Sequence, residues 1–143
     1  MNTATILKLK GNGVVTATAN QSLLDIAKLL AQYRIGSVVI VEDDDKVRGI
    51  ISEHDLIRAI GQAGSKVLNE PVHNFMATAV VTARRTDTCD QLMSEMTTRK
   101  FRHMPVVELG RLVGIVSIGD LVKMHVADAE FESDAMRQQI TTA

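Results

Sequence analysis

The sequence predicts a mixed α/β (α+β) protein made of two similar repeats of element order β-α-β-β-α, which pack sheet to sheet about a pseudo-twofold axis. Three observations predict this architecture. The motif GIISEHD at residues 49–55 returns as GIVSIGD at residues 114–120. The strand-like triplet Val-Val-Thr at residues 14–16 returns at residues 80–82. Apolar residues at helical spacing follow each triplet in the same phase.

Each repeat is expected to contain a capped first helix. Ser22 and Thr88 precede the apolar stripes, and each is followed three residues later by a side chain able to reach back, Asp25 or Gln91. The spacing i, i+3, i+4, i+7 then places one apolar stripe of each helix against a core. The stripes are Leu23, Ile26, Ala27 and Leu30 in the first repeat and Cys89, Leu92, Met93 and Met96 in the second.

Two apolar runs with the composition of strands follow each helix. They cover residues 38–41 and 47–51 in the first repeat and residues 104–107 and 112–116 in the second. Together with the triplets, these runs predict a three-stranded sheet in each repeat. Pro105 lies within one run, and because proline has no N–H, we expect its strand at an edge of the sheet or near a strand end.

The repeats divide the chain into three parts. Residues 1–66 hold the first repeat and an N-terminal extension, residues 67–127 hold the second repeat, and residues 128–143 form a tail. The last helix of the second repeat is expected to end near residue 126. The sequence predicts a short helical extension at each end of the chain. The N-terminal one runs from Thr3 to Gly11, and the C-terminal one has a thin apolar face of Phe131, Ala135 and Ile140.

Composition and charge exclude several classes of protein. The 143 residues are 45% hydrophobic and 23% charged, which is typical of a soluble globular protein. Sixteen basic and seventeen acidic side chains give a net charge of −1, so we expect neither nucleic acid nor an anionic membrane as a partner. A single cysteine, Cys89, and the lack of a long apolar stretch favour the cytoplasm.

The repeated motif has two interpretations. Ser52 with Asp55, and Ser117 with Asp120, have the spacing of a helix capping box, which is a structural role. Alternatively, each strand-to-helix turn offers free backbone N–H groups to a phosphate, and each carboxylate can accept hydrogen bonds from both hydroxyls of a ribose. The same residues can serve both roles.

A basic stretch distinguishes the two repeats. RKFRH at residues 99–103 precedes an apolar run of the second repeat, whereas RIGS at residues 34–37 stands at the equivalent place in the first. Such a run can be a solvated helix end, where cations are favoured. If it lines a cleft between the repeats, the two clefts are unequal.

With these features, the chain resembles a tandem pair of CBS (cystathionine-β-synthase) domains, the unit called a Bateman module. The resemblance covers nearly everything from Gly13 to Val126 and rests on GIISEHDLIRAI, GIVSIGDLVKMHV and FRHMPVVELGRLVGIVS. It implies a stand-alone signal-transduction module that senses an adenosine derivative (AMP, ADP, ATP, NAD or S-adenosylmethionine) between the repeats. It also implies a homodimer and a downstream protein partner that the sequence does not identify.

The resemblance further implies a role for individual residues. Asp55 and Asp120 would hold ribose hydroxyls, with Ser52 and Ser117 beside the ribose or phosphate, and Arg102 and His103 would contact phosphate. Thr16 and Thr82 would frame the base, and the pocket would be completed by Ser37, Val38, Met104 and Pro105, with His54 and Gly119 inside the motifs.

Two other classes of function are weighed against a sensor. One is a structural dimerisation or protein-interaction module that binds no ligand. The other is an enzyme, which we do not expect because the sequence has no nucleophile with its base, no phosphate-binding P-loop and no metal-ligand spacing among its four histidines and Cys89. We therefore predict neither catalytic residues nor a metal site.

Overall fold

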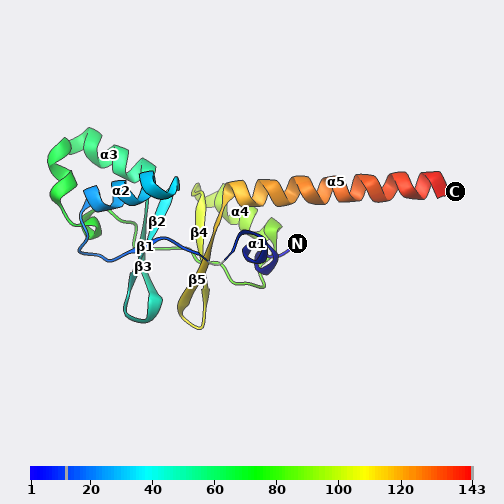
Figure 1. The fold of residues 1–143 in the computed structure, drawn as a ribbon, viewed down its shortest axis with the longest axis horizontal. Helices are drawn as coiled ribbons and strands as arrows, with labels where there is room; N and C mark the ends of the chain where they lie inside the picture. The colour runs from blue at the N-terminus through cyan, green and yellow to red at the C-terminus, as the bar shows by residue number, and fades with distance from the viewer. Residues whose placement is uncertain (12, 143) are drawn as a thin grey trace.

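The computed structural model describes the backbone of residues 1–11 and 13–142 and side chains as far as Gln138. Two halves lie side by side, with helices on one side and strand hairpins on the other (Figure 1). The first half contains β1 (Thr16–Ala17), α2 (Leu23–Tyr33), β2 (Ser37–Glu42), β3 (Lys46–Ser52) and α3 (Glu53–Ala63). The second contains α4 (Cys89–Arg99), β4 (His103–Glu108), β5 (Arg111–Ser117) and α5 (Ile118–Thr142). The N-terminal helix α1 spans Thr3–Lys10.

Side-chain caps begin α2 and α4 where the sequence predicts them. Ser22 Oγ accepts from the backbone N–H of Asp25 at 3.1 Å. At α4 the box is reciprocal, because Gln91 N donates to Thr88 Oγ1 at 3.1 Å and Thr88 N donates to Gln91 Oε1 at 2.9 Å. These bonds satisfy N–H groups that have no partner within the helix. The predicted stripes face the cores, with Leu23, Ile26, Leu30, Cys89, Leu92 and Met96 buried.

The two sheets differ in their first strand. In the first half β1 pairs with β2 in parallel, and β2 pairs with β3 antiparallel, so the predicted three-stranded sheet is confirmed. In the second half β4 and β5 form a two-stranded sheet, to which Ala83 adds one parallel bridge at Val106. The prediction of a third regular strand there is wrong.

Pro105 explains the difference. Thr16 pairs with Val39 in the first half, but the residue equivalent to Val39 is Pro105, which has no N–H to donate. Pro105 O still accepts from Ala83 N at 2.8 Å, and so only one bridge survives. The predicted edge position of the proline strand is confirmed, since β4 pairs with one regular strand, β5.

Each half is completed by a segment that precedes the other half in the sequence. Helix α1 precedes the first half, yet Ile6 and Leu7 are buried in the core of the second, and Thr3 N donates to Asp87 O at 2.9 Å. In return, Val67 and Val72, which precede the second half, are buried in the core of the first. The second core is therefore closed by α1, which precedes the first half, and the first core is closed by the segment that links the two halves.

The motif glycines receive these exchanged segments. A Cβ on Gly114 would lie 2.5 Å from a terminal carbon of Leu7. A Cβ on Gly49 would lie 2.7 Å from the sulfur of Met76 and 2.8 Å from the carbonyl oxygen of Ala77. Ala77 also exchanges backbone hydrogen bonds with Ile50 of β3, at 2.9 and 3.0 Å. Gly49 leaves room for backbone and Gly114 for the end of a side chain, so the constraint on a Cβ is stricter at Gly49.

Helix α5 is longer than the sequence predicts. We expected a helix ending near residue 126 and a separate tail, but one helix continues to Thr142 and projects beyond the body (Figure 1). No proline or glycine follows Gly119, so nothing ends the helix. In the expected apolar face, Phe131 is 75% exposed and Ala135 half-buried, and the side chain of Ile140 lies outside the described residues.

No helix of the part described has both the length and the apolar composition that crossing a membrane requires.

We predict that Gly49→Ala destabilises the fold. The added methyl would press on the Ala77 carbonyl, which is backbone and cannot move aside as a side chain can, and such overpacking costs about 1–3 kcal/mol of unfolding free energy. Urea unfolding measures the change. The matched control is Gly61→Ala in α3, where a Cβ meets nothing within 4 Å and stability should stay equal or rise by about 0.5–1 kcal/mol. Equal stability of the two variants would contradict the packing described.

Candidate functional site

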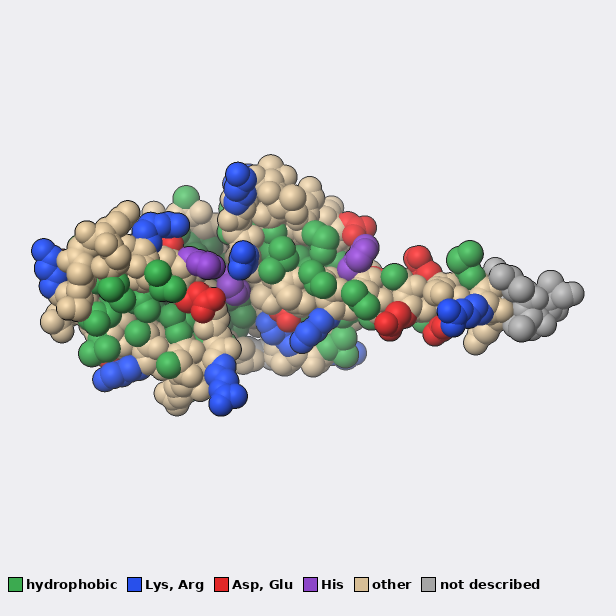
Figure 2. Space-filling model, turned by 90° about the horizontal axis from the view of Figure 1, so that it is seen from above, with side chains coloured by type: hydrophobic (Ala, Val, Ile, Leu, Met, Phe, Trp, Pro, Cys, Tyr) green, Lys and Arg blue, Asp and Glu red, His purple; other side chains and the backbone are tan. Residues whose placement is uncertain are grey.

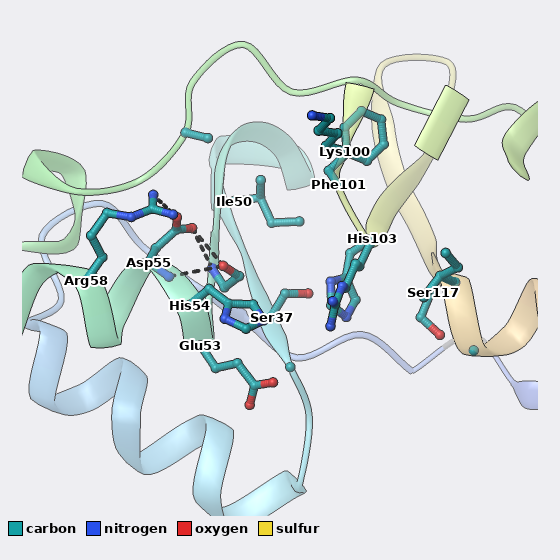
Figure 3. A pocket seen from close by; sticks show the side chains of 16 residues that line it. Ser37, Ile50, Glu53, His54, Asp55, Arg58, Lys100, Phe101, His103 and Ser117 are labelled. Carbon is teal, nitrogen blue, oxygen red and sulfur yellow. Dashed lines mark hydrogen bonds and ion pairs between the residues drawn. The ribbon is translucent and has the colours of Figure 1, made fainter. Parts of the chain in front are cut away.

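A cavity of about 680 Å³ lies between the halves, where the N-terminus of α3 faces the turn between α4 and β4 (Figure 3). This volume falls within the range of about 300–1,000 Å³ typical of small-molecule sites. The first half contributes the start of β2, part of β3 and the first turns of α3. The second contributes residues 100–103 and the turn between β5 and α5. Residues far apart in the sequence therefore share one cavity.

Asp55 forms the acidic wall of this cavity. Its Oδ2 accepts hydrogen bonds from Ser52 N at 2.9 Å and Ser52 Oγ at 3.0 Å, and Asp55 N donates to Ser52 Oγ at 3.2 Å. The predicted capping box is confirmed, and it holds the carboxylate in one orientation (Figure 3). Oδ1 lies 3.8 Å from Arg58 Nη1, beyond hydrogen-bond length, so this oxygen can still accept from a ligand.

The opposite wall is basic. Lys100, in the left-handed conformation with φ 59°, ends α4 and turns the chain so that Phe101, Arg102 and His103 follow along the cavity. Arg102 O accepts from Ile118 N at 2.8 Å, which ties this wall to the start of α5. Figure 3 shows Lys100, Phe101 and His103 facing Asp55 and Arg58 across the cavity. An acidic group and a basic cluster thus stand on opposite sides of the same space.

Ser37 lies between these walls. Its side chain is buried, and its Oγ has no hydrogen-bond partner among the described residues. Figure 3 shows the hydroxyl between β2 and His103. A buried hydroxyl without a partner is costly, and a polar ligand entering the cavity can supply one. Ser37 therefore offers a polar contact to a molecule that enters the cavity.

His103 is packed against the first half. A Cβ on Gly36 would lie 3.2 Å from the His103 ring, so Gly36 makes room for it. Burial lowers the pKa of His103 below its ordinary value, and the nearby cations Lys10 and Arg102 lower it further, although Glu53 and Asp120 oppose them. The imidazole is therefore neutral at physiological pH and can both donate and accept a hydrogen bond.

Asp120, the counterpart of Asp55, is already paired. Ser117 N donates to its Oδ2 at 2.8 Å and Asp120 N donates to Ser117 Oγ at 3.2 Å, so this capping box is also confirmed. The same Oδ2 accepts from Lys10 Nζ at 2.7 Å. Burial alone would raise the pKa of Asp120, but the hydrogen bonds and charge of Lys10, together with Ser117, outweigh it and hold the pKa below its usual value.

The structure brings some of the sequence-predicted residues together and separates others. Eight of them line the large cavity: Ser37, Ser52, His54, Asp55, Arg102, His103, Ser117 and Gly119. Thr82 and Met104 line a different cavity of about 600 Å³ beside α4. Thr16 is exposed on β1, and Val38 and Pro105 are buried within β2 and β4. Asp120 pairs with Lys10 instead of lining the large cavity.

Sequence reasoning missed Lys10, Arg58 and Lys100 as components of these sites. Arg58 could have been found, because it follows Asp55 by three residues on one helix and so shares its face. Lys100 stood in the basic stretch but was not assigned a role. Lys10 had no signal, since it meets Asp120 across 110 residues of sequence.

Within the described part of the chain, no group of three or more His, Cys, Asp and Glu side chains is placed to hold a metal ion. Cys89 is buried, and burial raises the pKa of its thiol, which makes the thiolate rare.

Known proteins share this architecture. The family model of the CBS domain matches residues 11–62 and 72–126. An uncharacterized protein of Acidianus ambivalens is 30% identical over 111 residues, which are 77% of this chain and 66% of that protein. Among solved structures, a CBS-domain containing protein from Agrobacterium tumefaciens is 41% identical with a TM-score of 0.84, over 87% of this chain and 99% of its own.

A CBS domain protein from Pyrobaculum aerophilum, solved as a complex with AMP, is 27% identical with a TM-score of 0.75, over 84% of this chain and 89% of its own. The two matched ranges coincide with the two repeats of the chain. The chain belongs to the CBS-domain family and carries two CBS domains in tandem.

Proposed function

We propose that this protein is a regulatory module that binds an adenosine derivative (AMP, ADP, ATP or NAD) in the cavity between its two CBS domains. The observation that carries the proposal is the arrangement of one cavity, with the fixed carboxylate of Asp55 on one wall and Lys100, Arg102 and His103 on the other. The AMP complex of the Pyrobaculum aerophilum relative supports this class of ligand.

The chemistry of each wall suits one part of a nucleotide. Asp55 Oδ1 can accept hydrogen bonds from the two hydroxyls of a ribose, and such bonds to an ionised acceptor are the stronger kind. The guanidinium of Arg102 and the ammonium of Lys100 suit a phosphate. Ile50 and Phe101 offer apolar surface on which a purine can lie.

The alternative is a dimerisation module that binds no ligand. Ser37 favours a ligand, because its buried Oγ has no partner among the described residues. A cavity that served only structure would be expected to leave no such hydroxyl unsatisfied. We propose regulation rather than catalysis, because the Ser37 hydroxyl, although it lies toward the neutral His103 imidazole, forms no hydrogen bond with it among the described residues. A downstream protein partner and a cytoplasmic location stay predictions from the sequence.

We predict that AMP, or another ligand from a panel with ADP, ATP, NAD and S-adenosylmethionine, raises the melting temperature. A ligand at about 100 times its dissociation constant adds about 2.7 kcal/mol to the unfolding free energy. Asp55→Ala should abolish this gain, because the ribose loses its acceptor. The control Gln91→Ala removes a capping-box side chain from α4 but leaves the Asp55 wall intact, and should keep the ligand response. A panel without any effect would favour the dimerisation module.

Arg102→Ala is expected to weaken the binding of AMP more than the binding of adenosine. Losing one charge-assisted hydrogen bond costs about 1.5–3 kcal/mol, or about ten- to a hundredfold in affinity, and only AMP carries the phosphate. Calorimetric titration measures both ligands. Arg99→Ala is the matched control, because Arg99 pairs with Glu95 at 3.0 Å on α4 and does not line the large cavity. If adenosine and AMP binding were weakened equally, Arg102 would not be a phosphate contact.

We also propose that the protein is a homodimer that associates through its helices. Figure 2 looks onto the helical side, where apolar side chains gather over both halves and continue along the projecting part of α5. Several of these helices expose large apolar residues, which rarely cluster on a monomer without a partner. They include Tyr33 at 52%, Ile57 at 67%, and Val122 and Val126 at 48% each.

Analytical ultracentrifugation should therefore find about twice the chain mass of 15.6 kDa at micromolar concentration. Ile57→Asp, which places a charge on the helical side, should shift the species toward monomer. Leu109→Asp is the control, because Leu109 is 98% exposed at the tip of the β4–β5 hairpin, away from the helices (Figure 1). A wild-type protein that sediments as a monomer would contradict the proposal.

A further inference from the structure

The two domains present equivalent turns that are not equivalent sites. Ser52 with Asp55 and Ser117 with Asp120 form the same capping box. Beside the first box lies the cavity of about 680 Å³, which Asp55 lines. Near the second box lies a cavity of about 320 Å³, which Lys10 and Ser117 line and Asp120 does not. The two turns differ in the cation that lies beside the aspartate carboxylate.

The ammonium of Lys10 is hydrogen-bonded to Asp120, and the backbone of Lys10 belongs to a helix that is packed against the same domain. Its Nζ donates to Asp120 Oδ2 at 2.7 Å and to the carbonyl oxygen of Ile115 at 2.9 Å. Its backbone ends α1, which is anchored by Leu7, a fully buried residue packed on Gly114. The ammonium therefore stands on a fixed element and bridges β5 to the start of α5.

Among the residues that the structure describes, the first domain has no such cation at the matching place. The segment that packs on Gly49, as α1 packs on Gly114, brings Met76 and Ala77 against the strand. The positive group nearest Asp55 is Arg58, on the same helix and 3.8 Å away, with its side chain 67% exposed. Both carboxylates use Oδ2 for the capping box, but Asp120 also holds an ammonium at that oxygen, and its side chain is 19% exposed against 30% for Asp55.

We infer that Lys10 is an internal competitor for Asp120, which restricts tight nucleotide binding to the cavity of Asp55. This inference rests on the proposed function, because it concerns which carboxylate receives the ribose. Ribose hydroxyls are neutral donors, and an ammonium makes a stronger, charge-assisted bond to the same carboxylate. The Lys10 ammonium takes the charge-assisted bond at Oδ2, so an adenylate that reaches Asp120 must either displace Lys10 or share the carboxylate with it through Oδ1.

The opposite role for Lys10 would be a phosphate contact in the smaller cavity. The basic residue Arg102 of the large cavity has Gly36 as its counterpart there, so a cation from elsewhere could replace it. The ammonium donates to two oxygens of the chain, which leaves one of its three N–H groups for a phosphate. The two roles predict opposite effects of removing the charge.

Calorimetric titration with AMP, at concentrations that reveal weak as well as tight sites, distinguishes these roles. Wild-type protein should bind one AMP per chain tightly. Lys10→Met should add a second AMP per chain, with an affinity at that site at least about tenfold higher than in the wild type. Lys8→Met, on the exposed side of the same helix, is the matched control and should behave as wild type. Lys10→Gln serves if the methionine variant proves unstable in a melting experiment.

The double variant Lys10→Met with Asp120→Asn should return to one AMP per chain, because the second site needs its carboxylate. Two equal sites in wild-type protein, an unchanged stoichiometry in both Lys10 variants, or weaker AMP binding in them would overturn the inference and leave the proposed function standing. Failure of wild type and Lys10 variants alike to bind AMP, ADP, ATP or NAD would overturn both.

Discussion

The exchange of segments between the two domains is the constraint on which the structure depends. Leu7 packs on Gly114 of one domain, and Met76 with Ala77 packs on Gly49 of the other. Each core is thus closed by residues that precede the opposite domain, and each contact requires a strand without a side chain at that point. This exchange fixes the two domains against each other. It also brings α3 of the first domain opposite the α4–β4 turn of the second, which creates the large cavity.

The capping boxes connect this architecture to binding. A serine and an aspartate at the start of α3 and α5 satisfy helix N–H groups, and the same bonds orient the carboxylates. Structural and functional interpretations of the motif are therefore compatible, because the capped oxygen and the oxygen proposed to accept from a ribose are different atoms of Asp55. The same exchange of segments makes the two boxes unequal, since α1 ends in Lys10 and residues 76–77 hold no cation.

Much of the fold could be predicted from local pattern. The caps at Ser22 and Thr88, the buried stripes and the strand pairs all follow from spacing that repeats within a few residues. The prediction of a third strand in the second sheet was wrong because Pro105 has no N–H to donate, and the strand is reduced to a single bridge. The predicted end of α5 near residue 126 was wrong because no helix-breaking residue follows, and the helix continues whether or not a core faces it.

The sequence by itself determined the duplication, the helix caps, the basic stretch beside the cavity and thus the family, because each depends on neighbours in the chain. Only the tertiary structure decided which residues of the two domains share a cavity, that Thr82 and Met104 face another one, and that Lys10 holds Asp120. The physical reason is that a contact across 110 residues leaves no trace in local spacing, and it exists only once α1 has packed against the domain it does not precede.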